Sequence, residues 1–174
     1  MYKFTTPKQL NDYLNTFDYG ILYKNKKIKN PNCNDFKKYR TLEPLTFFKY
    51  KIGVCWDYTA AEYFYFKNNF NYKCETIYIE IFDKLSSSHT FLLYYDKGYC
   101  YYFESCYEKY KGIHKFKNKK EAINFVLNNM LKKNNNFKYI INEYCINEYG
   151  LKTLEFMDIV TKQTLRGIEN EKIN

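Results

Sequence analysis

The sequence predicts an α+β fold in which a central helix packs on an antiparallel sheet, and three segments carry this prediction. Residues 55–69 read as a helix, because aromatic and apolar residues recur along them at helical spacing. Residues 74–82 alternate three isoleucines with other residues, which is the period of a β-strand. Residues 89–105 form two aromatic-rich runs joined by Asp-Lys-Gly, which is the pattern of a hairpin. A helix followed by neighbouring antiparallel strands is typical of α+β proteins.

Further elements are expected on both sides of this central part. Thr6 can cap a helix that starts at Pro7, and Gln9 would complete a capping box. The remaining predicted elements are a strand at 18–25, an irregular loop at 26–40, a helix from about 119, a strand at 137–146 and a helix at 150–165. Neither an internal repeat nor a linker divides the chain, so we expect one domain over residues 1–174.

The charge of the chain is strongly basic, but its pattern does not favour nucleic-acid binding. The 174 residues carry a net charge of +9, and 45% of them are apolar, which is ample for a core. The lysines form separated clusters at 24–29, 37–40 and 115–120. Arginine, the better reader of phosphates and base edges, occurs only as Arg40 and Arg166. A basic nucleic-acid-associated protein is therefore an alternative and not the leading prediction.

The cysteines and the N-terminal segment indicate the compartment. No two cysteines form a CxxC pair, so we expect no zinc site. The segment 1–10 lacks the apolar stretch of a signal peptide, and no apolar run is long enough to span a membrane. We therefore expect a cytoplasmic protein with free thiols. Five cysteines are expected to pack as small apolar residues: Cys33, Cys74, Cys100, Cys106 and Cys145.

Cys55 differs from these because it begins the predicted central helix, in the stretch KIGVCWDYTAAEYFYF at 51–66. We expect Gly53 to let the backbone turn sharply before the helix, and Asp57 to pair with free N–H groups at its start. A thiol at a helix N-terminus faces unpaired N–H groups and the positive end of the dipole, and both favour the thiolate. A nucleophilic Cys55 then needs an imidazole, because a proton must be moved near neutral pH.

Hairpin pairing favours His89 over His114 as the catalytic base. With a turn at 96–97, His89 lies directly opposite Glu104, whose carboxylate could hold the imidazole by its second nitrogen. With a turn at 97–98, Glu104 lies diagonal to His89 but on the same face of the sheet. Both registers bring the two side chains near each other. His114, expected in a loop after the hairpin, stays the alternative base.

These residues resemble a known family. The stretch GVCWDYTA is similar to the nucleophile motif of transglutaminases and transglutaminase-like proteins, in which Gly-x-Cys-Trp opens the central helix. In that family a histidine at the start of a strand and a carboxylate near the end of the next strand follow. The resemblance implies that Cys55 is the nucleophile, His89 the general base and Glu104 the orienting acid. It also implies an oxyanion site made by the Cys55 backbone N–H and a group of Trp56.

For the fold, the resemblance implies a papain-like, transglutaminase-type core at about 40–116, with a C-terminal extension of helices and a strand at about 119–168. For the function, it implies a cysteine-dependent acyl-transfer enzyme without cofactor or metal, which hydrolyses a peptide, isopeptide or amide bond of a peptide or protein. Two residues depart from the family pattern, since Glu104 stands where aspartate is usual and Val54 where glutamine is frequent. A non-catalytic protein- or peptide-binding module on the same fold is the other alternative.

Overall fold

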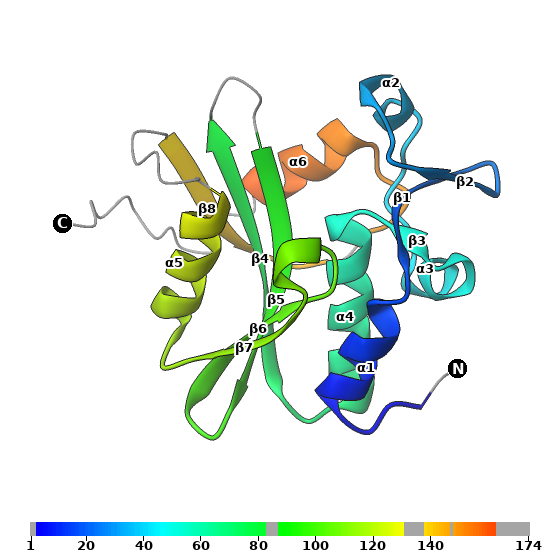
Figure 1. The fold of residues 1–174 in the computed structure, drawn as a ribbon. Helices are drawn as coiled ribbons and strands as arrows, with labels where there is room; N and C mark the ends of the chain where they lie inside the picture. Colours follow the sequence, from blue (N-terminus) through cyan, green and yellow to red (C-terminus); the bar gives the residue numbers. More distant parts are fainter. Residues whose placement is uncertain (1–2, 83–86, 131–137, 147, 163–174) are drawn as a thin grey trace.

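The computed structural model describes residues 3–82, 87–130, 138–146 and 148–162, and it is an α+β protein, as predicted (Figure 1). The helices are α1 (Pro7–Leu14), α2 (Cys33–Phe36), α3 (Pro44–Tyr50), α4 (Cys55–Asn69), the 3₁₀ turn η1 (Glu108–Tyr110), α5 (Lys119–Met130) and α6 (Thr153–Lys162). The strands are β1 (Asp18–Tyr23), β2 (Lys26–Lys29), β3 (Ile52–Gly53), β4 (Lys73–Phe82), β5 (Ser87–Asp96), β6 (Tyr99–Glu104), β7 (Gly112–Phe116) and β8 (Lys138–Tyr144).

The main sheet has five strands in the order β7-β6-β5-β4-β8, and each neighbouring pair is antiparallel. The hairpin of β5 and β6 turns at Lys97 and Gly98, both of which have positive φ. This is the second of the two predicted registers. It leaves Glu104 diagonal to His89 instead of directly opposite it.

Two helices cover opposite faces of the main sheet, α4 on one side and α5 on the other (Figure 1). On the α4 side, Tyr65 and Phe66 pack with Leu92 and Phe103. On the α5 side, the isoleucines of β4 pack with apolar residues of α5. The period-two alternation of β4 therefore divides its side chains between two apolar layers, which explains why both of its faces are hydrophobic.

The region before α4 is more ordered than the sequence predicts. A second, small sheet joins β1 to β2 in antiparallel and to β3 in parallel orientation. The segment 26–40, expected to be an irregular loop, contains β2 and the short helix α2, so that expectation is wrong. β2 pairs with β1 through a tight turn at Lys24 and Asn25, both with positive φ.

The central helix α4 starts at Cys55 and ends at Asn69, as predicted. Gly53, however, does not have the positive φ of a sharp glycine turn, so its expected role is wrong. Instead, a Cβ atom at Gly53 would lie 2.6 Å from Asp57 Cβ and 2.7 Å from Phe47 Cε2. The glycine is needed because α3 and the first turn of α4 pack closely against this position.

Candidate active site

Cys55 and His89 line the same cleft, which has a volume of about 790 Å³. The first turn of α4, the start of β5 and the segment that follows β6 all contribute to its walls. Other polar residues on the walls include Asp18, Tyr19, Asn30, Tyr58, Ser87, Ser88, Tyr107, Glu108 and Lys111. The cleft therefore combines a thiol, an imidazole and several hydroxyl groups, which is the chemical inventory of a nucleophilic site.

Cys55 is held at the helix start by the side chain of Asp57. The carboxylate of Asp57 accepts hydrogen bonds from the backbone N–H of Val54 at 2.9 Å and of Leu42 at 2.7 Å. It also accepts a hydrogen bond from the hydroxyl of Tyr39 at 2.7 Å. Burial raises the pKa of Asp57 to about 7, although these three hydrogen bonds oppose the shift. Asp57 thus binds backbone N–H groups at the helix start, as expected, and fixes the first turn of α4.

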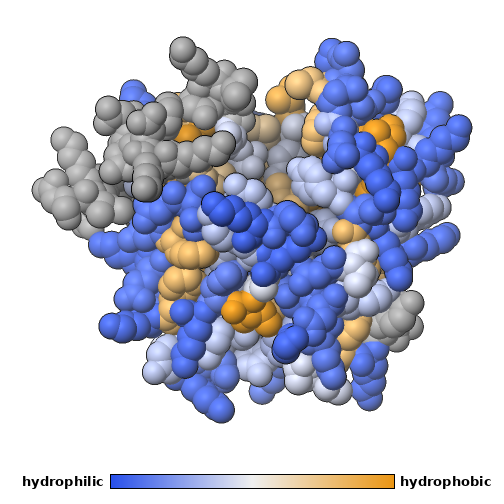
Figure 2. Space-filling model, viewed as in Figure 1, coloured by the Kyte–Doolittle hydropathy of each residue, from blue (hydrophilic) through white to orange (hydrophobic). Residues whose placement is uncertain are grey.

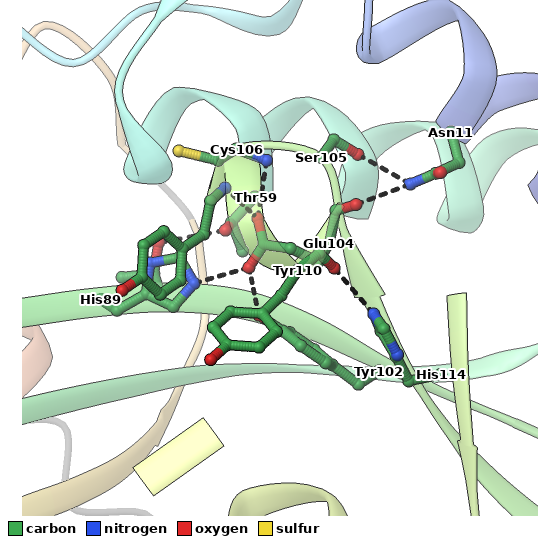
Figure 3. A network of polar contacts seen from close by, with 11 residues as sticks. Asn11, Thr59, His89, Tyr102, Glu104, Ser105, Cys106, Tyr110 and His114 are labelled. Atoms are coloured by element: carbon green, nitrogen blue, oxygen red, sulfur yellow. Dashed lines mark hydrogen bonds and ion pairs between the residues drawn. The ribbon is translucent and has the colours of Figure 1, made fainter. Parts of the chain in front are cut away.

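Glu104 is the centre of a hydrogen-bond network that holds His89 (Figure 3). The imidazole Nε2 of His89 lies 2.8 Å from Glu104 Oε2. The same oxygen accepts a hydrogen bond from the hydroxyl of Tyr102. Glu104 Oε1 accepts backbone N–H bonds from Cys106 at 2.6 Å and Tyr107 at 2.7 Å. With both oxygens occupied, the carboxylate has a fixed orientation toward the imidazole.

The electrostatics of the pair follow from this geometry. Burial lowers the pKa of His89, but the charge of Glu104 and hydrogen bonds with Cys55 and Glu104 outweigh it and raise that pKa to about 10. Burial opposes ionisation of Glu104, yet the charge of His89 and the hydrogen bonds lower the pKa of Glu104 below its usual value. At neutral pH the pair is therefore an imidazolium beside a carboxylate. The hydrogen bond between His89 and Cys55 places that positive charge beside the thiol.

A second contact aligns α4 with β5 near the site. The hydroxyls of Thr59 and Thr90 are 3.0 Å apart and both are buried. Thr59 lies one helical turn after Cys55, and Thr90 directly follows His89. The hydrogen bond therefore fixes the position of α4 along its own axis relative to β5, the strand that carries the imidazole.

Trp56 packs in the core, and its indole is not among the described groups that line the cleft. The ring stacks on Phe156 of α6, with centroids 4.2 Å apart, and lies 5.9 Å from Tyr39. Its Nε1 is buried without a hydrogen-bond partner in the described part of the chain. Only the backbone of Trp56 is therefore near the start of α4 where an oxyanion would lie.

His114, the alternative base, does not line the cleft as far as the structure describes it. It lies in β7 and not in a loop, so its expected setting is wrong. Its Nε2 is 2.7 Å from the backbone oxygen of Tyr110, and its ring stacks on Tyr102 (Figure 3). These contacts give it a packing role on the far side of Tyr102 from His89.

The expectation that the other cysteines are buried holds only in part. Cys74 and Cys100 are buried, as predicted. Cys33 and Cys145 are exposed, so the expectation is wrong for them. Cys106 is partly buried and lines the cleft beside Cys55. Cys106 lies two residues after the end of β6, where the chain bends back. The bend brings the Cys106 N–H to the Glu104 carboxylate and the Cys106 side chain to the cleft wall.

Sequence reasoning missed a further buried carboxyl group and an amide near the site. Glu62 of α4 is only 2% exposed and forms a side-chain hydrogen bond with Ser105. Burial and the nearby charge of Glu104 raise the pKa of Glu62 well above its usual value. Asn11 of α1 donates hydrogen bonds to the backbone oxygen of Glu104 at 2.8 Å and to Ser105 Oγ at 3.2 Å (Figure 3). A glutamate inside an apolar helix was the available signal for Glu62.

Several lysines are engaged within the fold. Lys119, the first residue of α5, pairs with Glu75 at 2.8 Å and Glu143 at 2.6 Å, which joins α5 to β4 and β8. Lys29 pairs with Asp18 at 2.7 Å. Figure 2 shows hydrophilic residues spread over most of one face of the molecule. Lys119 therefore links α5 to the main sheet, whereas Lys29 forms a more exposed pair within the small sheet.

The described residues contain no group of three or more His, Cys, Asp or Glu side chains that could hold a metal ion. None of the described helices is long and apolar enough to cross a membrane. Comparisons of the chain with protein-family models, with curated proteins and with solved structures find no match. The functional argument therefore depends on the residues of the cleft themselves.

Proposed function

We propose that this chain is a cysteine-dependent acyl-transfer enzyme with a papain-like, transglutaminase-type core. The observation that carries the proposal is that Cys55 and His89 line one cleft while Glu104 holds the His89 imidazole at 2.8 Å. A nucleophile, a base within hydrogen-bond reach and a group that orients the base are the requirements for nucleophilic catalysis. The substrate class that fits this chemistry is a peptide or protein with an accessible amide.

In the proposed reaction, the Cys55 thiolate attacks the carbonyl carbon of the amide and forms a tetrahedral intermediate with a negative oxygen. The intermediate collapses when its C–N bond breaks, and the His89 imidazolium gives its proton to the departing amine. The product is a thioester on Cys55. His89, now neutral, takes a proton from water as the water attacks the thioester, and loss of the Cys55 thiolate releases the carboxylic acid and restores the thiolate beside the imidazolium. The overall reaction is hydrolysis of a peptide, isopeptide or side-chain amide bond.

The test is the rate at which iodoacetamide alkylates each cysteine, mapped by peptide mass spectrometry at about pH 6, where an ordinary thiol is mostly protonated. We expect Cys55 to react about tenfold or more faster than the exposed Cys33, because only the thiolate is nucleophilic. The rate at Cys55 should fall by about tenfold or more in His89→Ala, since the positive charge beside the thiol is lost. Glu104→Ala should have a similar but smaller effect.

Cys33 serves as a control within the same chain, because its rate should not change in either variant. His114→Ala is the matched control for loss of an imidazole outside the cleft. If Cys55 reacts no faster than Cys33, or reacts only after unfolding, Cys55 is a structural thiol. The enzymatic proposal is then wrong, and the domain would be tested as a peptide-binding module.

A further inference from the structure

The proposed reaction needs a hydrogen-bond donor that the triad does not supply. A tetrahedral intermediate carries a negative oxygen, and enzymes stabilise it with two or more fixed donors. The backbone N–H of Cys55 is one candidate, since the first N–H groups of a helix have no acceptor within the helix. The indole of Trp56 is not the second, because the ring is stacked on Phe156 in the core.

Three of the other donors that line the cleft are already engaged. The hydroxyl of Tyr58 donates to the backbone oxygen of Asp18. The hydroxyl of Ser88 forms a hydrogen bond with Tyr78. The ammonium group of Lys111 is paired with Glu108 at 2.7 Å. Use of any of these groups on an oxyanion would require breaking an existing contact, whereas preorganised donors cost no such rearrangement.

Tyr19 differs from these three residues because it lies on the strand next to β3, and because its hydroxyl makes no hydrogen bond with the described residues. It lies on β1, directly across from Gly53 of β3, two residues before Cys55. It lines the cleft together with Cys55 and is 45% exposed. Within the part of the chain that the structure describes, its hydroxyl makes no hydrogen bond. A phenol donor therefore lines the cleft from the small sheet, while His89 lines it from the main sheet.

We propose that the hydroxyl of Tyr19 is the second oxyanion donor, which binds the negative oxygen of the tetrahedral intermediate together with the Cys55 backbone N–H. This inference rests on the proposed function and adds a catalytic residue to it. Through the pairing of β1 with β3, the donor is fixed to the strand that leads into α4. The small sheet then has a catalytic purpose, because it places Tyr19 relative to Cys55.

Electrostatics support this assignment. Although the side chain is 45% exposed, partial burial of the phenol and then the nearby charge of Cys55 raise the pKa of Tyr19 above its usual value. The hydroxyl therefore keeps its proton at every pH at which an enzyme of this kind would work. A proton that stays on the oxygen is the property that an oxyanion donor requires.

Two reactions of Cys55 separate this role from a structural one. Alkylation by iodoacetamide displaces iodide from carbon and forms no oxyanion. Acylation by p-nitrophenyl acetate forms a tetrahedral oxyanion, which collapses to an acetyl thioester as p-nitrophenolate leaves. A residue that merely supports Cys55 affects both reactions, whereas an oxyanion donor affects only the second.

We expect Tyr19→Phe to slow acylation of Cys55 by about 10- to 100-fold. Removal of one oxyanion donor usually lowers the rate of an enzyme by roughly 10²–10³-fold, and we expect a smaller loss here because p-nitrophenolate is a good leaving group. Alkylation of Cys55 in Tyr19→Phe should stay within about twofold of the unsubstituted protein, because the thiolate is unchanged. The matched control is Tyr23→Phe, which removes a phenol on the same strand as Tyr19 that is not among the described residues lining the cleft. Both rates should be unaffected in that variant.

The proposal is overturned if Tyr19→Phe slows acylation less than about threefold, or if it slows both reactions equally, since loss of a donor acts on the oxyanion alone. A failure of the proposed function would look different. In that case the unsubstituted protein itself forms no acetyl thioester on Cys55 and alkylates no faster at Cys55 than at Cys33, and both proposals are wrong.

Discussion

At the scale of single residues, the use of glutamate at position 104 has a geometric reason. The observed register places Glu104 diagonal to His89 and not directly opposite it. Diagonal neighbours on a sheet lie about 7–8 Å apart, compared with about 4.5–5.5 Å for directly opposed residues. The additional methylene of glutamate spans this larger separation and reaches Nε2 of His89 at 2.8 Å. An aspartate would suit the other register, in which the two residues face each other.

The charge pair makes a prediction about stability and pH. The pKa of His89 is raised to about 10 in the folded protein, so its proton is held more tightly there than in the unfolded chain. The stabilisation is complete below about pH 6.5, the usual value for histidine, and it is lost as pH rises toward the folded-state pKa. We compare Cys55→Ala with Cys55→Ala/His89→Gln, since a free thiol ordinarily titrates in the same range.

We expect Cys55→Ala to be the more stable of the two proteins near pH 6, measured by urea unfolding. The difference should shrink as pH rises above about 6.5, by at most about 1.4 kcal/mol per pH unit. The difference in stability should also shrink as pH falls below about 4.5. The pKa of Glu104 is lowered in the folded protein, so the unfolded chain takes up a proton at this carboxyl group first, and the stabilisation is lost. A difference that does not change between about pH 6.5 and 9 would show that Glu104 without Cys55 does not raise the pKa of His89 in the folded protein.

The sequence could predict which site residues lie together when they belong to one hairpin. It could not predict this for residues that are brought together by strands far apart in the chain. His89 and Glu104 belong to one hairpin, so counting along the chain was enough to bring them together. Tyr19 lines the same cleft as Cys55 through the pairing of β1 with β3, which no local pattern indicates. Its identity as a tyrosine also carried little information in a chain with 21 tyrosines.

At the scale of elements, the start of α4 depends on close packing with α3. The sequence correctly indicated a special role for Gly53, but the reason is space and not backbone conformation. The sequence alone could not distinguish these reasons, because α3 was not predicted. The hairpin of β1 and β2 was missed for a related reason: its turn at Lys24 and Asn25 is hidden in a lysine-rich stretch.

This packing predicts the effect of Gly53→Ala. The new methyl group would lie 2.7 Å from Phe47 Cε2 and 2.6 Å from Asp57 Cβ, so α3 and α4 must separate. We expect a loss of about 1–3 kcal/mol in the free energy of unfolding, which is usual for overpacking in a core. The measurement is urea unfolding of Gly53→Ala, Phe47→Leu and the double variant. Since the smaller leucine leaves room, the two substitutions should be non-additive by at least about 0.5 kcal/mol. Additive effects would contradict a clash with Phe47.

At the scale of the whole molecule, the C-terminal helix belongs to the same core as the candidate nucleophile. Phe156 of α6 is 7% exposed and stacks on Trp56, which directly follows Cys55. Tyr144 at the end of β8 contacts the same ring of Phe156. Backbone hydrogen bonds between Thr41 and Leu151, and between Gly150 and Thr41, hold the segment before α6 against the region before α3. The part of the chain after α5 is therefore continuous with the core around Cys55.

This continuity predicts that Phe156→Ala destabilises the entire domain by about 3–5 kcal/mol, as expected for loss of a buried phenylalanine. Leu154→Ala is the matched control on the same helix, because Leu154 is 78% exposed and its loss should change stability by no more than about 0.5 kcal/mol. Urea unfolding should be followed both by circular dichroism and by fluorescence of Trp56, the single tryptophan of the chain. In one cooperative domain the two signals change together, and Phe156→Ala moves both to lower urea. If only the fluorescence changes while the circular dichroism transition stays in place, α6 docks on a core that is stable without it.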